Sequence, residues 1–165
     1  MSKTSNVKSP LPNRALKIAF VVDDLDKYLE RFATLFGMET PDTIVTGPQE
    51  ETQMEYRGAA TDGRARLGYI PLENITLELI EPMGGPSIWQ SCLDARGSGL
   101  HHIAFIVNGM SQVIADLDSL GLPLAQTGMF PALGKAPSGN FAFLESIEQL
   151  GFDIELLEFD VTTKQ

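Results

Sequence analysis

The pattern of apolar and polar residues runs through the same order twice along the chain. Residues 15–22 (ALKIAFVV) and residues 100–107 (LHHIAFIV) share the tripeptide Ile-Ala-Phe inside an apolar run of strand length. Each run ends in a short polar break. Each half later closes on a second strand pattern, ITLELIE at residues 75–81 and FDIELLE at residues 152–158. The sequence therefore predicts one internal duplication.

A helix is predicted after each polar break, because apolar residues recur there at helical spacing. The first pattern covers residues 25–36, with Asp23 or Asp24 placed to cap its start and Gly37 just beyond its end. The second covers residues 110–120 and is also followed by glycine. Each half thus reads as a strand, a helix and further strands.

A short linker helix is predicted between the two halves. It covers residues 86–97, with Pro86 suited to the first turn and a glycine at the end. The linker separates module one, residues 15–82, from module two, residues 100–158. Loops of different length account for the slightly shorter second module.

The remaining strands are expected between each helix and its closing strand. In module one, residues 53–57 and 64–71 are predicted to pair as a hairpin, with an Asp-Gly turn at residues 62–63. In module two, the corresponding strands are residues 123–126 and 141–145.

Composition narrows the classes of partner. The chain has 165 residues, 43% of them hydrophobic, which predicts one globular domain with a sizeable core. Its formal net charge of −10 argues against nucleic acid, which needs concentrated Lys and Arg. It leaves room for a phosphorylated small molecule, which needs a few local cations. We expect a small-molecule ligand and a homodimer.

The ends of the chain are read as flexible tails, residues 1–14 and 159–165. The first of them is basic and rich in Ser and Pro but has no apolar segment typical of a secretory signal. No apolar run approaches the roughly 18 residues that cross a bilayer, so no membrane association is expected. Cys92 is the single cysteine, which excludes an intrachain disulfide. These features favour a cytoplasmic protein.

Strand parity gathers four ionisable side chains. Side chains alternate between the two faces of a strand, and the apolar faces of the closing strands are expected to pack on the helices. This leaves Lys17, Glu78, His102 and Glu155 on the other face, where a two-fold repeat brings them together. His101 has the opposite parity to His102 and is interpreted as a packed or surface histidine.

The chain resembles the vicinal-oxygen-chelate superfamily of glyoxalases, bleomycin resistance proteins and dioxygenases. The stretch GLHHIAF at residues 99–105 is similar to the start of the second module of methylmalonyl-CoA epimerases. The strands ITLELIEP and FDIELLE resemble the module-closing strands. The resemblance covers about residues 16–158. It implies an α+β fold of two βαβββ modules with pseudo-two-fold symmetry, whose curved mixed sheet surrounds a central pocket.

The resemblance also implies a divalent metal held by one residue from the opening and closing strands of each module. Transferred to this chain, His102, Glu78 and Glu155 are three of the ligands, and they suit Zn²⁺, Mn²⁺, Co²⁺ or Ni²⁺. The fourth place, usually His, is Lys17. A protonated ammonium cannot bind a metal. The alternative is a metal-free cluster in which Lys17 neutralises one glutamate and His102 hydrogen-bonds the other.

Three functions follow from the resemblance. The first is a glyoxalase- or epimerase-like isomerase or lyase on a small carbonyl or acyl-CoA-like thioester, with Glu155 and Lys17 as catalytic groups. Methylmalonyl-CoA epimerases usually carry a catalytic glutamate on the strand matching residues 65–72 (ARLGYIPL), which here has no carboxylate. The second function is a metal-free binding protein of the drug-resistance type. The third, an extradiol dioxygenase, needs histidine in both opening strands and is disfavoured by Lys17.

Overall fold

The two segments that share Ile-Ala-Phe lie side by side at the centre of one sheet. They are β1 (Lys17–Val21) and β7 (Gly99–Ile106), and they pair antiparallel with Ile18 opposite Ile103. These two isoleucines occupy the same position in the two repeats. The pseudo-two-fold axis therefore passes through this pair, as the internal duplication predicts.

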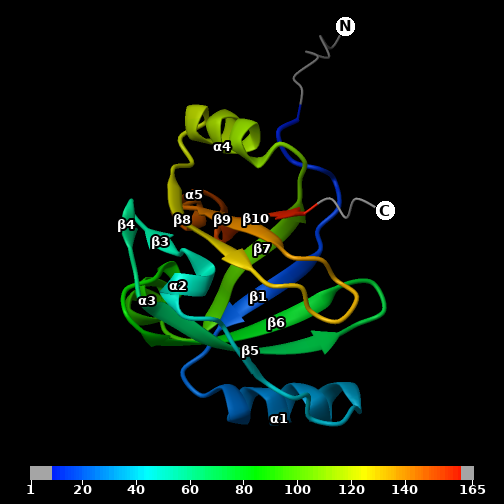
Figure 1. Cartoon of the computed structure of the whole chain (residues 1–165). Helices are drawn as coiled ribbons and strands as arrows, with labels where there is room; N and C mark the ends of the chain where they lie inside the picture. Colours follow the sequence, from blue (N-terminus) through cyan, green and yellow to red (C-terminus); the bar gives the residue numbers. More distant parts are fainter. Residues whose placement is uncertain (1–8, 161–165) are drawn as a thin grey trace, which may run out of the picture.

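The structure is a computed structural model that describes residues 9–160. Within them, ten strands form one curved mixed sheet, with outer helices at its two ends (Figure 1). Of the predicted tails, residues 1–14 and 159–165, the parts 1–8 and 161–165 lie outside the described residues, and Phe159 is the last residue of a strand, not part of a tail. Residues 9–14 have no helix or strand, and Leu11 packs against the apolar cluster of module two.

Module one follows the order βαβββ with an insertion. Its elements, in chain order, are β1, α1 (Leu25–Phe36), β2 (Ile44–Val45), α2 (Gln49–Thr52), β3 (Glu55–Tyr56), β4 (Ala59–Ala60), β5 (Gly63–Pro71) and β6 (Thr76–Gly84). Strands β1, β6, β5 and β2 are neighbours in that order. The segment from α2 to β4 is the insertion.

Module two repeats the order with one added short helix between its last two strands. After the linker helix α3 (Ile88–Arg96), its elements are β7, α4 (Met110–Ser119), β8 (Leu124–Phe130), β9 (Gly139–Leu144), α5 (Ile147–Leu150) and β10 (Asp153–Phe159). Strands β7, β10, β9 and β8 are neighbours in that order. The two βαβββ modules of the expected fold are confirmed.

Helix α1 begins and ends where its capping residues predict. The Asp24 carboxylate accepts a hydrogen bond from Lys27 N at 3.1 Å, and Gly37 ends the helix in the left-handed conformation (φ 65°). The helix packs closely on β5, because a Cβ at Gly68 would lie 2.6 Å from the Leu29 side chain. The first helix thus covers the face of the sheet that the apolar pattern assigns to it.

The predicted hairpin of module one is wrong. Strand β5 pairs with β6 and β2, whereas β3 pairs with β4 and with β8 of module two. The tight turn is Arg57-Gly58, where both residues have positive φ, and not the predicted Asp-Gly. The insertion therefore crosses from module one to the outer edge of module two. Local turn signals carry no information about that non-local pairing.

The linker helix is two residues shorter at its start than predicted. Ser87 caps it by accepting a hydrogen bond from Gln90 N at 3.1 Å, so Pro86 lies before the first turn. Trp89, on this helix, contacts Phe143 edge to face with ring centroids 5.9 Å apart. The helix thus joins the apolar cluster beneath the inner face of the sheet. No helix of the described residues has the length and apolar character that crossing a membrane requires.

Candidate functional site

The four side chains singled out by parity come from the four central strands. Lys17 and His102 occupy equivalent places on β1 and β7, while Glu78 on β6 and Glu155 on β10 are equivalent in the closing strands. Glu78 lies beside Ala19 and Glu155 beside Ala104, so small side chains leave room at the centre. Pseudo-symmetry therefore builds one site from both modules.

The polar atoms of these side chains converge. Lys17 Nζ lies 2.8 Å from Glu78 Oε2 and 3.1 Å from Glu155 Oε2. His102 Nε2 lies 3.4 Å and 3.1 Å from the same two oxygens. The two carboxylates thus face each other, with an ammonium and an imidazole between them. The convergence that strand parity predicts is observed.

Burial makes these charges strongly interdependent. The glutamates are nearly inaccessible, and the Lys17 side chain is 13% exposed. Burial alone would lower the pKa of Lys17, but the two carboxylates outweigh it and raise that pKa above its usual range. Burial opposes ionisation of Glu78, yet Lys17 and His102 hold its pKa well below its usual range. Lys17 is therefore a cation and Glu78 an anion at neutral pH.

The fit of a divalent metal depends on Lys17. One ligand atom each from Glu78, His102 and Glu155 lies within 4.8 Å of the others, which is a possible three-ligand site. Glu78 Oε2, His102 Nε2 and Glu155 Oε2 are also buried and face one another. However, the Lys17 ammonium already contacts both carboxylate oxygens. With Lys17 protonated, the centre does not fit a metal ion.

His101 lies beside His102 and not on the opposite face. The register between β1 and β7 shifts so that Ala19 faces His102 and Phe20 faces Leu100, which leaves His101 as the extra residue of a β-bulge. Its Nδ1 lies 2.7 Å from His102 Nδ1, and both rings are fully buried. Packing of His101 is confirmed, but simple alternation fails at the bulge.

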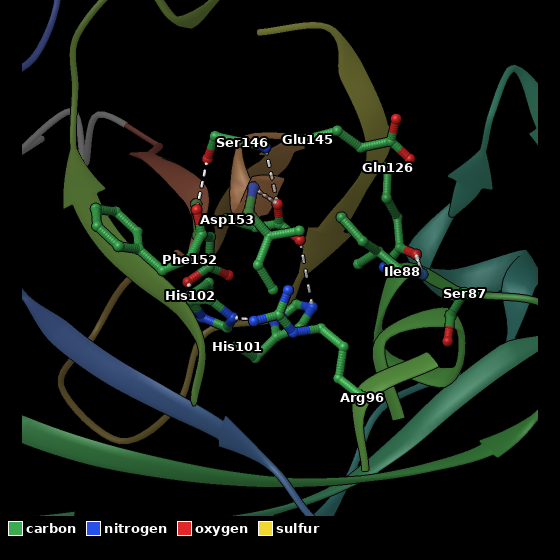
Figure 2. A network of polar contacts seen from close by, with 12 residues as sticks. Ser87, Ile88, Arg96, His101, His102, Gln126, Glu145, Ser146, Phe152 and Asp153 are labelled. Atoms are coloured by element: carbon green, nitrogen blue, oxygen red, sulfur yellow. Dashed lines mark hydrogen bonds and ion pairs between the residues drawn. The ribbon is translucent and has the colours of Figure 1, made fainter. Parts of the chain in front are cut away.

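Asp153 lies between the two histidines and Ser146 (Figure 2). Its Oδ1 accepts hydrogen bonds from Ser146 N at 2.8 Å and Ile147 N at 2.9 Å, and its Oδ2 lies 3.8 Å from His101 Nε2. Burial and the neighbouring His102 lower the pKa of His101, which keeps that ring neutral. The pKa of His102 is raised, because Glu155 and Glu78 outweigh its burial. The pair therefore links the site to the turn before β10.

Tyr69 is a site residue that the sequence interpretation missed. It lies on β5 directly opposite Glu78, and burial followed by the charge of Glu78 raises its pKa above its usual range. Its hydroxyl therefore stays protonated and can donate a hydrogen bond. Tyr69 lies on the strand where the family's usual carboxylate was sought, and a search for carboxylates passes over a phenol.

The convergent side chains form the floor of a cavity of about 760 Å³. Apolar side chains from both modules make its walls, among them Met54, Trp89, Phe141, Phe143 and Leu157. Leu133 and Ala136 of the loop between β8 and β9 also line it. A polar floor below apolar walls is typical of a small-molecule pocket.

Similarity to known proteins agrees with this architecture. The chain is 33% identical over 95 residues to the uncharacterized protein YqjC of Bacillus subtilis (strain 168), a match that spans 58% of this chain and 66% of that protein. Just under two thirds of that relative is therefore covered.

Solved structures share the fold at low sequence identity. Methylmalonyl-CoA epimerase from Mycobacterium tuberculosis matches with a TM-score of 0.56 and 22% identity, covering 94% of this chain and 93% of that one. A variant of the Streptomyces coelicolor methylmalonyl-CoA epimerase, in complex with 2-nitronate-propionyl-CoA, matches with a TM-score of 0.57 and 20% identity, covering 92% of this chain and 98% of that one.

A family pattern covers most of the chain. Residues 17–143, from the first central strand to the third strand of module two, match the pattern of one family. This span includes Lys17, Glu78 and His102. The chain belongs to the glyoxalase/bleomycin resistance protein/dioxygenase superfamily.

Proposed function

We propose that this protein is a glyoxalase- or epimerase-like isomerase or lyase that moves a proton at the carbon next to a carbonyl. The substrate is a small carbonyl compound or an acyl thioester. The observation that carries the proposal is a buried ammonium between two carboxylates on the floor of an apolar pocket. Solved epimerases of the same fold, one of them in complex with 2-nitronate-propionyl-CoA, support a reacting carbonyl of this class but not the identity of its carrier.

The residues divide into a base and a pair of donors. The low pKa of Glu78 makes it a weak base, which leaves Glu155 to take the proton from carbon. The electron pair of that C–H bond moves onto the carbonyl oxygen and forms an enolate. Lys17 and Tyr69 then stabilise the oxygen by charge and hydrogen bonding. Return of a proton to the other face of the same carbon completes an epimerisation. In an α-hydroxy carbonyl compound, deprotonation gives an enediolate, and return of the proton to the neighbouring carbon completes an isomerisation.

No step of this mechanism passes through a metal ion. In the wider family a divalent metal supplies positive charge for the developing enolate. Here Lys17 contacts the carboxylate oxygens that a metal would need. The ammonium therefore takes the part of the cation.

Exchange of substrate hydrogen with solvent tests this proposal. Small ketones and acyl thioesters are incubated with the protein in D₂O, and loss of the proton next to the carbonyl is followed by NMR. Glu155→Gln is expected to slow the exchange at least about 100-fold, because it removes the base but keeps the shape. Glu148→Gln, on an exposed side chain of α5, is the matched control. Full exchange in Glu155→Gln would contradict the assignment of the base.

Tyr69→Phe tests the second donor. Losing one hydrogen bond to the enolate oxygen is expected to lower the exchange rate about tenfold, with little change in substrate affinity. Tyr28→Phe, on the outer helix α1, is the control. An unchanged rate in Tyr69→Phe would assign the stabilisation to Lys17 alone.

A metal-free binding protein is the second candidate. The observation in its favour is that the Lys17 ammonium already compensates the charge of the two carboxylates. The buried charges of the floor are thus paired with one another, and none of them has to react. Saturable binding of a carbonyl ligand with no hydrogen exchange, in the same samples, would select this alternative.

A further inference from the structure

We propose that the pocket selects substrates without phosphate groups, so that its carbonyl compound is a largely apolar molecule whose far end is uncharged or cationic. This inference rests on the proposed function, because it specifies the substrate class of the same site. Three features carry it: the charge of the lining, the composition of the walls and the side chains around the rim.

The ionisable lining of the pocket is acidic. Among residues 9–160, the cavity is lined by two basic side chains, Lys17 and His102, and by three carboxylates, those of Glu39, Glu78 and Glu155. Lys17 is not free to meet a phosphate, since its ammonium lies within 3.1 Å of both Glu78 and Glu155. A phosphate that reached the floor from solvent would therefore meet an excess of negative charge. An enolate formed there differs, because Glu155 loses its own charge when it takes the proton.

The walls suit an apolar body. Trp89, Phe141 and Phe143 contact one another with ring centroids 5.7–6.5 Å apart and form a continuous aromatic wall. Met54 and Leu157 extend it. A ligand that fills this space gains free energy by burying apolar surface. A hydrated phosphate would lose its water there without replacement.

The rim continues the acidic character outward. A smaller cavity of about 200 Å³ shares Gly47, Thr52, Met129, Phe130 and Pro131 with the main pocket. It adds the carboxylates of Glu51 and Asp160, and Asp160 accepts a hydrogen bond from Ser138 at 2.6 Å. A basic side chain near this rim is Lys135, which is exposed in the loop after β8. The phosphate-bearing part of a coenzyme that extended out of the pocket would therefore pass the Glu51 and Asp160 carboxylates, which repel it.

Comparing two thioesters that share one acyl group but differ in the thiol that carries it isolates the effect of the carrier's charge on binding. Isovaleryl-N-acetylcysteamine is uncharged, whereas isovaleryl-coenzyme A carries phosphates on an otherwise similar thioester. Trp89 is the single tryptophan and lines the pocket, so its fluorescence reports binding. The uncharged thioester is expected to bind at least about tenfold more tightly at low salt, and added salt should narrow the difference.

Charge reversal at the rim tests the cause. Glu39→Lys combined with Glu51→Lys should bring the two affinities within about threefold of each other, because it replaces two carboxylates with cations. Glu30→Lys combined with Glu148→Lys adds the same charge at exposed positions outside the pocket and should leave the preference unchanged. Equal or tighter binding of the coenzyme A thioester to the wild type would overturn the inference. So would unchanged Trp89 fluorescence with both compounds, which would mean that neither thioester enters the pocket.

The same samples keep this inference apart from the proposed function. Hydrogen exchange next to the thioester carbonyl is followed by NMR in D₂O. Selective binding of the uncharged thioester without exchange would overturn the proposed reaction and leave the selection intact. Exchange that is faster with the coenzyme A thioester would overturn the selection and leave the reaction intact.

Discussion

Replacing Lys17 with methionine is expected to lower the free energy of unfolding by about 3–5 kcal/mol. Methionine keeps the length and apolar stem of lysine but removes the ammonium. Glu78 and Glu155, which are 3% and 5% exposed, would then face each other without the ammonium, with His102 as the remaining basic neighbour. Urea denaturation at pH 7 measures the loss. Lys27→Met, at an exposed position of α1, is the control and should change stability by less than about 0.5 kcal/mol.

The pH dependence gives this prediction a second readout. In the wild type, Lys17 and His102 hold the pKa of Glu78 low, so its stabilising contribution is complete above its ordinary pKa of 4.5 and is lost as pH falls further. In Lys17→Met, two facing carboxylates raise the pKa of one of them. Acid then relieves the repulsion, and the gap between variant and wild type narrows as pH falls from 7 to about 4. A difference in unfolding free energy below about 1 kcal/mol, or one that does not change with pH, would contradict a buried ion cluster at this site.

Lys17→His is expected to convert the centre into a metal site. It removes the ammonium and completes a set of two histidines and two glutamates, the set expected in the family. Structural zinc sites with four ligands bind with roughly 10–16 kcal/mol, or about 2.5–4 kcal/mol per ligand. The added ligand should therefore raise the affinity for Zn²⁺, Co²⁺ or Mn²⁺ about 100- to 1000-fold. Calorimetry on metal-stripped protein measures the change.

Two further variants serve as controls for the metal titration. Lys27→His adds an exposed histidine on α1 and should gain nothing. Combining Lys17→His with Glu78→Gln should lose most of the gain, since it removes a carboxylate ligand. Tight stoichiometric metal in the wild type, with no gain in Lys17→His, would show that the lysine does not replace a ligand. Weak binding in both would show that the centre is not a metal site.

Much of the architecture is predictable from periodicity. The capping residues locate α1, and the alternation in the opening and closing strands places Lys17, Glu78, His102 and Glu155 on one face. These predictions succeed because each depends on neighbours in sequence or on the repeat. The repeat also predicts that these four side chains meet at one site, and the pairing of β1 with β7 brings the two modules together there.

The features that escape prediction depend on contacts far apart in sequence. The bulge at His101 arises from the register between β1 and β7, which no pattern within one strand reveals. Tyr69 was missed because its role comes from Glu78 on the next strand. The pairing of β3 with β8 joins residues about seventy positions apart, and two-residue strands give no periodic signal.

The insertion of module one also affects how the two halves depend on each other. Strand β3 pairs with β8, Arg57 N donates to Ala125 O at 2.7 Å, and the Arg57 guanidinium contacts Glu145 at 2.7 Å. Without these contacts, β8 would be an open edge strand with unpaired backbone groups. Although the sequence is a tandem duplication, the two modules are not independent, because module one supplies the strand that covers the outer edge of module two. If the chain were divided at the linker, module two would expose β8 as an edge strand open to pairing with other chains. Module one would keep the β3–β4 hairpin without the strand on which it packs.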